Sequence, residues 1–297
     1  MRTREQQIAH VTLVGSVVNL LLVGLKATAG IAAHSAAMVS DAVHSLSDLI
    51  TDFIVLIFVR VSGRPQDEGH DFGHGKYETV ATLLIGLALA AAAVGIVVSG
   101  ATKLAAWLQG EDLPAPGRLA LWAALVSIVA KELLYQYTRI RGKKLESTAL
   151  KANAWHHRSD SLSSIGAAIG IGGAILLGDR WTVLDPLASI VVGAMLVKVA
   201  WDLMGPSFGE LTERSLPAET ENEMMEIIRS VEGVEDPHNL RTRRIGNRVA
   251  IEVHVRMDGS QTLAQAHESA THIEKQLKER FGADSHVTIH MEPVKEA

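Results

Sequence analysis

Six long apolar stretches occupy most of the chain before Phe208, and they limit the possible folds more than any other feature of the sequence. Each stretch is close to the roughly 20 residues that an α-helix needs to cross about 30 Å of hydrocarbon. We expect them to form membrane-spanning helices, because a helix satisfies its own backbone hydrogen bonds in lipid. Their approximate bounds are 11–31, 35–59, 79–101, 119–137, 152–177 and 186–204.

The composition agrees with helices packed in lipid. Hydrophobic residues make up 47% of the 297 residues, aromatic residues only 4%, and the chain has 25 glycines. Small residues allow membrane helices to approach one another closely. The formal charge of −5 does not favour a nucleic-acid partner. The absence of Cys excludes disulfides, thiol catalysis and thiolate metal ligands, whereas 13 His are available as ligands.

Basic residues indicate how the helices are oriented. They gather at the N-terminus and after the second and fourth stretches, which the positive-inside rule assigns to the cytoplasmic side. We therefore expect a multi-pass protein of the cell inner (cytoplasmic) membrane with both termini in the cytoplasm. Lys131 and Glu132 lie inside the fourth stretch, about two turns from its basic end. We expect them to snorkel to that surface or to pair there.

The remainder of the chain has a different pattern. Residues 210–297 carry 17 acidic and 11 basic residues, so the net negative charge belongs to this part. Apolar periodicity predicts a helix at 219–231, strands at 240–244 and 249–257, a helix at 263–281 and a last strand at 286–291. We predict an all-α membrane domain over 1–208 and a cytoplasmic α+β domain over 209–297, with two helices on one face of a small sheet.

The second apolar stretch contains four ionisable residues on one helical face. Asp41, His44, Asp48 and Asp52 are three or four residues apart, which is the spacing of one face of a helix. Ionisable residues inside membrane spans usually have a function, because facing them to lipid is costly. A buried His–Asp hydrogen bond within the helix is the alternative interpretation.

The fifth stretch repeats the arrangement. His156 and Asp160 are four residues apart, and His157 lies beside them. Two helices that each offer a His and a carboxylate can surround a divalent ion with four ligands in tetrahedral geometry. The repeated spacing in two separate spans favours a metal site over two unrelated hydrogen bonds.

Two further groups of candidate ligands lie outside the spans. Asp67, His70 and His74 share a glycine-rich loop and could form a solvent-facing metal site, although a loop that is merely polar and flexible would look the same. In the tail we expect candidate ligands to converge at one edge of the sheet, with scattered surface histidines as the alternative. The tail candidates are His238, His254, His267, His290 and Glu292.

Several motifs together resemble the cation diffusion facilitators, which are divalent-metal transporters with six membrane helices and a cytoplasmic ferredoxin-like (αββαβ) domain. The resemblance covers nearly the whole chain. The most specific motifs are Ser40–Asp48, Phe72–Lys76, Trp155–Asp160, Leu184–Pro186 and Asp236–Arg243.

The resemblance implies a role for each group of candidate residues. The transport site would comprise His44, Asp48, His156 and Asp160, with Asp41, Asp52 and His157 in its second shell or along the pathway. The loop and tail groups would be further metal sites, and the tail group lies at the dimer interface in relatives. Glu292 stands where some relatives have Asp, and Met291 replaces a polar neighbour. Lys76 and Glu213 are expected to form a salt bridge at the junction of the two domains.

The expected function is Zn²⁺ efflux by proton antiport with alternating access in a homodimer. Zn²⁺ would be both the substrate and a regulatory ligand, and no organic cofactor is expected. Two His with two carboxylates favour Zn²⁺, while Fe²⁺, Co²⁺, Cd²⁺, Ni²⁺ and Mn²⁺ remain open. The rival interpretations are a membrane metalloenzyme, for which no general-base motif is recognisable, and a membrane metal sensor, which would not need paired ligands in two spans.

Overall fold

A computed structural model describes residues 3–32, 49, 51–111, 118–177 and 179–294, and the chain divides into two compact units. The first unit comprises Met1–Pro65 and Tyr77–Ser207, and the second comprises Gln66–Lys76 and Phe208–Ala297. The sequence-based division assigned the loop at 66–76 to the membrane domain. In the structure this loop packs with the C-terminal unit instead.

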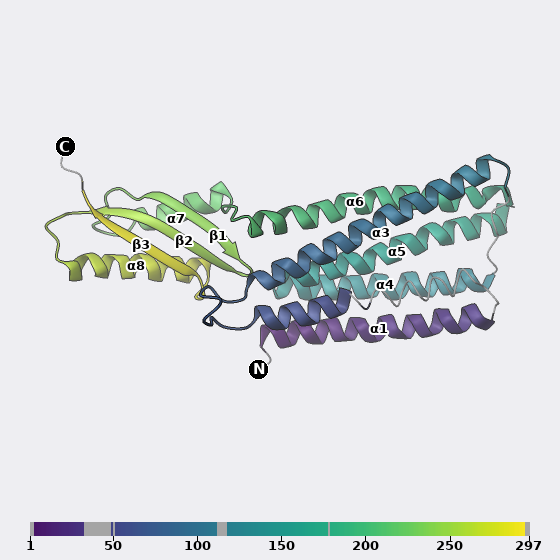
Figure 1. Ribbon diagram of the computed structural model, residues 1–297, viewed down its shortest axis with the longest axis horizontal. Helices are drawn as coiled ribbons and strands as arrows, with labels where there is room; N and C mark the ends of the chain where they lie inside the picture. The colour runs from purple at the N-terminus through teal and green to yellow at the C-terminus, as the bar shows by residue number, and fades with distance from the viewer. Residues whose placement is uncertain (1–2, 33–48, 50, 112–117, 178, 295–297) are drawn as a thin grey trace. The chain divides into compact units, whose positions relative to one another are not determined.

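The first unit consists of long helices that run side by side (Figure 1). They extend past the apolar stretches at their polar ends. For example, α4 includes Arg141, Lys143 and Lys144 in its last turn, where basic side chains complement the helix dipole. Residues 51–62 are also helical, and a 3₁₀ turn at Asp179–Val183 precedes α6. The helices are α1 (Arg4–Ala32), α3 (Lys76–Leu108), α4 (Arg118–Lys144), α5 (Thr148–Leu177) and α6 (Leu184–Leu211).

The surface of this unit suits a lipid environment. Within the described residues, three helical segments are long and apolar enough to cross a membrane, and they are Arg4–Thr28, Lys76–Leu108 and Ser189–Leu211. Large apolar side chains such as Leu21, Trp122 and Trp201 are 67% to 73% exposed. An exposed apolar surface of this kind is expected where lipid rather than water surrounds the helices.

Small residues bring α3 and α6 together. A Cβ added at Gly193 of α6 would lie 2.6 Å from Cγ2 of Val97 on α3, and one at Gly86 of α3 would lie 2.6 Å from Cγ of Met204. Such distances are too short for a real side chain, so glycine is what permits this approach. Leu89, Ala93, Leu196 and Ala200 form the buried core between the same two helices.

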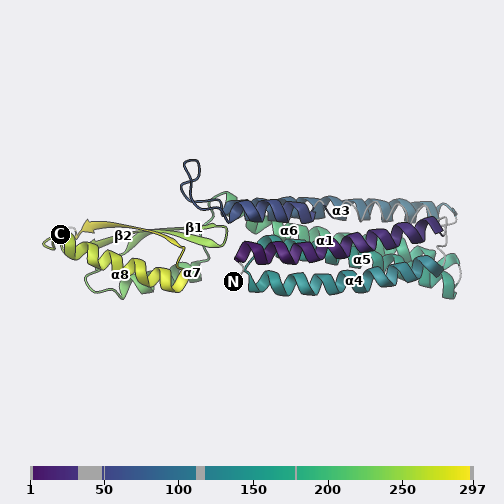
Figure 2. The same cartoon turned by 90° about the horizontal axis from the view of Figure 1, so that it is seen from below.

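The second unit confirms the predicted αββαβ order. It contains α7 (Ala218–Arg229), β1 (His238–Ile245), β2 (Arg248–Met257), α8 (Leu263–Phe281) and β3 (His286–Pro293). The sheet order is β1-β2-β3, with β1 antiparallel and β3 parallel to the central β2. Both helices lie on the same side of the sheet (Figure 2).

Alternation along β2 decides what each face of the sheet carries. Ile251, Val253 and Val255 are fully buried in the core that includes residues of α7 and α8. The residues between them, including His254 and Arg256, are half-buried and point to the opposite face. The helix-free face of the sheet is therefore the face that can hold a polar site.

Candidate metal-binding sites

Strand register brings three histidines of the tail side by side. His238 on β1 pairs with His254 on β2, and His254 pairs in turn with His290 on β3. The His238 and His254 ring centroids are 5.4 Å apart, and those of His254 and His290 are 4.6 Å apart. Because adjacent strands lie about 5 Å apart, residues paired across three strands must form such a row.

Glu292 joins this row from β3. His254 Nδ1 lies 2.9 Å from Glu292 Oε1, and His238 Nε2 lies 3.6 Å from Glu292 Oε2. One possible ligand atom from each of His238, His254 and Glu292 lies within 4.8 Å of the others, which is close enough to share one metal ion. The hydrogen bond from His254, opposed by desolvation and supported by the charges of His238, His254 and Arg256, lowers the pKa of the Glu292 carboxyl. An ionised Glu292 is the form that binds a cation.

His290 and His267 differ in their relation to this cluster. His290 Nε2 lies 3.7 Å from Glu292 Oε1, at the edge of the group. His267 lies on α8, is exposed, and belongs to the helical layer that covers the other face of the sheet. Contrary to the expected convergence, one protomer does not bring His267 to the cluster.

The loop residues also come together. Asp67 Oδ1 lies 3.2 Å from His70 Nδ1, Asp67 Oδ2 lies 3.4 Å from His74 Nε2, and the two imidazole centroids are 4.0 Å apart. Desolvation acts to raise the pKa of Asp67, but the hydrogen bonds from His70 and the Gly69 backbone and the charges of His74 and His70 lower it overall. His74 is buried while Asp67 and His70 are exposed, so the site opens to solvent.

Contacts within the second unit fix this loop against the sheet. The Phe72 ring contacts the Arg243 guanidinium, whose carbon is 5.1 Å from the ring centroid, and the His286 ring, whose centroid is 5.0 Å away. At Gly75, an added Cβ would lie 2.6 Å from the Ile245 carbonyl oxygen, so only glycine fits beside the end of β1. Lys76 donates to Glu213, as expected, although both residues belong to the second unit.

Arg243 also pairs with Glu213. Its Nη1 lies 3.1 Å from Glu213 Oε2, so one carboxylate accepts from two cations. The hydrogen bond from Lys76, opposed by some desolvation and supported by the charge of Arg243, lowers the pKa of Glu213. The Glu213 carboxylate therefore connects Lys76, at the end of the loop, with Arg243 on β1.

Half of the expected transport site can be located on α5. His156 is 7% exposed and lies one helical turn before Asp160, which is half-buried. Their expected partners His44 and Asp48, together with Asp41, lie outside the described residues. Lys131 does not snorkel, because it is only 1% exposed and its Nζ donates to Asp160 Oδ2 at 2.7 Å.

Asp52 and His157 belong to a second buried polar group. Asp52 accepts hydrogen bonds from Ser16 at 3.0 Å and Asn19 at 3.2 Å, both on α1, and from Asn153 on α5 at 2.8 Å. Asn153 also contacts His157 Nε2 at 3.5 Å. The structure therefore links His157 to Asp52 through Asn153.

The residues that sequence reasoning missed are polar partners within spans. Asn19, Asn153 and Ser16 are visible in the sequence as polar residues in apolar stretches, but no spacing rule identifies Asp52 as their acceptor. In the tail, Arg256 lies 3.7 Å from Glu292 and also pairs with Asp236. A basic residue two positions after His254 on the same strand face was the available signal.

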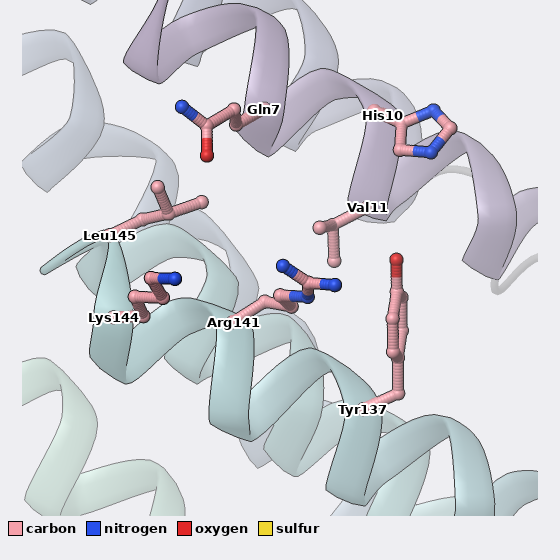
Figure 3. Close-up of a pocket in the computed structure, with 7 residues that line it drawn as sticks. All are labelled: Gln7, His10, Val11, Tyr137, Arg141, Lys144 and Leu145. Atoms are coloured by element: carbon pink, nitrogen blue, oxygen red, sulfur yellow. The ribbon is translucent and has the colours of Figure 1, made fainter.

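A cavity of about 530 Å³ between α1 and α4 differs from the metal-site candidates because its charged lining is basic (Figure 3). Its basic lining residues are His10, Arg141 and Lys144, and none of the residues that line it is a carboxylate. A lining of this charge repels divalent cations. The cavity is therefore not a metal site.

Comparisons with known proteins agree with this architecture. The sequence pattern described as the cation efflux transmembrane domain matches residues 12–212, and that of the cation efflux protein cytoplasmic domain matches residues 216–294. The chain is 33% identical over 294 residues to the manganese efflux system protein MneP of Bacillus subtilis, covering 98% of this chain and 97% of that protein.

Two other comparisons concern a second relative and a solved structure. The chain is 32% identical over 283 residues to the cation-efflux pump FieF of Pectobacterium atrosepticum, covering 93% of this chain and 90% of that one. A solved metal-bound C-terminal domain of the CzcD transporter from Thermotoga maritima is 34% identical, covers 27% of this chain and 99% of its own, and has a TM-score of 0.24.

Proposed function

The chain belongs to the cation diffusion facilitator family, also called the cation efflux family, and we propose that it exports Zn²⁺ in exchange for protons. Members of this family are membrane transporters of divalent cations rather than enzymes. The metal, the coupling ion and the ligands are the parts that belong to our proposal.

The observation that carries this proposal is the pair His156 and Asp160 on α5. A buried imidazole and a carboxylate one turn apart inside a membrane domain are costly unless they serve a ligand. His44 and Asp48 have the same four-residue spacing in the motif Ser40–Asp48 of the second apolar stretch. Together the four residues offer two nitrogen and two oxygen ligands.

Charge balance supports exchange with protons. Two neutral imidazoles and two ionised carboxylates make the site formally neutral when it holds a divalent ion, which lowers the cost of occupancy in a medium of low dielectric constant. Imidazole must lose its proton to bind a metal, so metal binding releases protons, and protonation of His44 and His156 at the other side releases the metal. Rocking of the helices about a fixed site would then give alternating access.

Donor chemistry favours Zn²⁺, and the comparisons supply a second candidate. A closed four-ligand site with two imidazoles suits Zn²⁺ better than Mn²⁺, which prefers oxygen ligands. A relative that spans nearly the whole chain is nevertheless described as a manganese efflux protein. Mn²⁺ is therefore the alternative substrate to test first.

We assign a regulatory role to the metal clusters of the second unit. The tail cluster of His238, His254 and Glu292 could bind an ion and so favour one arrangement of a homodimer. Because His267 lies on the helical layer of its own protomer, it could join such a cluster only from a second copy. The basic residues near the N-terminus and after the second and fourth spans support cytoplasmic termini.

The proposal is tested by metal uptake into proteoliposomes that contain the purified protein. Asp160→Asn keeps the shape of the side chain but removes its charge, and it should abolish Zn²⁺ uptake, as should Asp48→Asn. The matched control is Asp202→Asn on α6, whose carboxylate is 59% exposed and paired with Lys198, and which should transport normally. Unchanged uptake by Asp160→Asn would overturn the site assignment.

A competition experiment identifies which metal the protein transports. Wild-type uptake of Zn²⁺ should be inhibited only weakly by an equal concentration of Mn²⁺. Strong inhibition by Mn²⁺, together with faster Mn²⁺ uptake when each metal is offered alone, would show that the zinc assignment is wrong while the site assignment stands.

A further inference from the structure

The cavity between α1 and α4 offers the donors that an anionic group needs. Its volume of about 530 Å³ is within the range of roughly 300 to 1,000 Å³ that is usual for ligand sites. Arg141 lies with its guanidinium carbon 5.7 Å from the Tyr137 ring centroid, so both side chains occupy the same wall. The residues that line the cavity are Gln7, His10 and Val11 from α1, and Tyr137, Arg141, Lys144 and Leu145 from the end of α4 (Figure 3).

No acidic group of the described chain balances the charge of this lining. Within the residues that the structure describes, no carboxylate forms an ion pair with Arg141, Lys144 or His10. Glu78 of α3, which contacts α1, is already paired with Arg4 at 3.0 Å. Guanidinium and ammonium groups bind phosphate through strong, charge-assisted hydrogen bonds. An anion that enters the cavity would therefore gain such bonds without breaking an ion pair.

Exposed apolar faces of both helices lead to the cavity. On α1, Leu13 and Val17 are 55% and 51% exposed and lie three and seven residues after His10. On α4, Leu133 is 66% exposed and lies four residues before Tyr137. These spacings place the apolar residues on the same helical faces as the cavity residues. In a membrane, acyl chains that contact these faces would have their headgroups beside the cavity.

The cavity also lies at the end of the helices where headgroups are attracted. Arg141 and Lys144 are in the last turn of α4, at the side of the membrane that we propose to be cytoplasmic. Basic residues at this level attract anionic lipids of the inner leaflet. A free phosphate would use the donors but not the apolar faces, whereas a phospholipid uses both.

We propose that the cavity between α1 and α4 binds the headgroup of an anionic phospholipid, whose acyl chains lie along the exposed apolar faces of the two helices. Arg141 and Lys144 bind the phosphate, and the Tyr137 hydroxyl donates to one of its oxygens. The bound lipid thereby bridges α1 and α4. This inference goes beyond the proposed function, because it depends neither on the transport ligands nor on the metal.

A general preference for basic residues is the competing explanation. Basic side chains at the end of α4 complement the helix dipole and the negative membrane surface without forming a site. If that is their whole role, each basic residue at this end contributes alike to lipid binding. Arg139 and Lys143 belong to the same end of α4, are exposed and do not line the cavity. They are therefore matched controls for Arg141 and Lys144.

The test measures phosphatidylglycerol binding to the purified full-length protein in detergent by native mass spectrometry, with phosphatidylcholine as the zwitterionic comparison. We expect the wild type to bind phosphatidylglycerol at least about tenfold more tightly than phosphatidylcholine. Arg141→Gln and Lys144→Gln should each weaken phosphatidylglycerol binding about fivefold, and together about twentyfold. The double variant Arg139→Gln, Lys143→Gln should bind it as the wild type does.

Other results would overturn the proposal. Equal losses in the two double variants would show that only the surface charge matters, and unchanged binding without Arg141 and Lys144 would show that the lipid binds elsewhere. Inorganic phosphate and glycerol phosphate are added as competitors. If they displace phosphatidylglycerol as effectively as a soluble short-chain phosphatidylglycerol does, the acyl chains contribute nothing and the site is one for free phosphate.

A variant of α1 decides the question if the double variant of α4 does not fold. His10 is exposed, so His10→Glu should fold, and its carboxylate would repel the headgroup and pair with the basic residues of α4. We expect a loss of about tenfold or more in phosphatidylglycerol binding. Gln6→Glu is the matched control, because Gln6 is exposed on the same helix and does not line the cavity. Binding by His10→Glu equal to that of Gln6→Glu would contradict the proposal.

Discussion

Replacing Asp52 by Ala should loosen the helix bundle, because Asp52 accepts hydrogen bonds from two other helices. Its side chain is 1% exposed and accepts from Ser16 and Asn19 on α1 and from Asn153 on α5. Hydrogen bonds between membrane helices contribute roughly 0.6 to 1.7 kcal/mol each. The loss of all three therefore predicts a destabilisation of about 2 to 5 kcal/mol.

Asp52→Asn tests how much of this loss comes from the missing acceptor. The amide keeps one acceptor oxygen, so we expect about half of the destabilisation seen with Ala. Glu111→Ala is the control, because Glu111 is an exposed acidic residue of the same unit and should change stability by less than about 0.5 kcal/mol. Stability would be measured by reversible chemical denaturation in mixed micelles.

A double-mutant cycle makes the test specific. Asp52→Ala and Asn153→Ala together should cost less than the sum of the two single changes, since they remove the same 2.8 Å hydrogen bond. If Asp52→Ala is as stable as the wild type, or if the two changes are additive, the hydrogen-bonded group does not hold these helices together and our interpretation of Asp52 is wrong.

Three further predictions concern the second unit. Leu277→Ala empties a site that is 0% exposed in the core and should cost about 2 to 5 kcal/mol, measured by hydrogen exchange of the sheet amides; full protection would contradict this. Gly246→Ala should cost about 1 to 3 kcal/mol in the same assay, since Gly246 has a φ of +65° and its added Cβ would lie 2.5 Å from the Gly75 oxygen. Glu213→Gln should lower the thermal midpoint at neutral pH. The pKa of Glu213 is lower in the folded state than in the unfolded state, where it is about 4.3. The ionised carboxylate therefore stabilises the fold above that pH, and the stabilisation is lost as the pH falls through the folded pKa. A difference from wild type that persists in acid would refute the assigned cause.

The second unit could be predicted closely from the sequence because its signals are local. The helix expected at 263–281 is α8, which begins with the Thr262–Gln265 capping box and is closed by Gly282 at a φ of +114°. Apolar alternation along 249–257 correctly separated the core face of β2 from the His254 face, although Ala250 is buried as well. Local chemistry determines both features, so one sequence suffices.

The membrane helices were found with less accurate ends. The stretch at 79–101 lies within α3, which extends over Lys76–Leu108. Apolar residues mark only the part of a helix that lies in hydrocarbon, whereas the helix continues through polar residues wherever its backbone hydrogen bonds remain favourable.

Contacts between elements were the part that the sequence did not determine. Periodicity places His267 on a helix but does not say which layer of the domain carries that helix. Snorkelling and pairing were both open for Lys131, and its burial in a pair with Asp160 depends on how α4 packs against α5. The loop at 66–76 belongs to the second unit, where Gly75 lies against Ile245. No local sequence pattern predicts this contact.

The central claim is that metal moves through the chain in exchange for protons, and a single flux measurement tests it. Wild-type protein would be reconstituted in liposomes with an acidic lumen that contains a pH-sensitive dye, and Zn²⁺ would be added outside. We expect Zn²⁺ to enter while the lumen becomes more alkaline, with both signals absent in Asp160→Asn. Uptake of Zn²⁺ with no change in luminal pH beyond that of protein-free liposomes would contradict proton exchange.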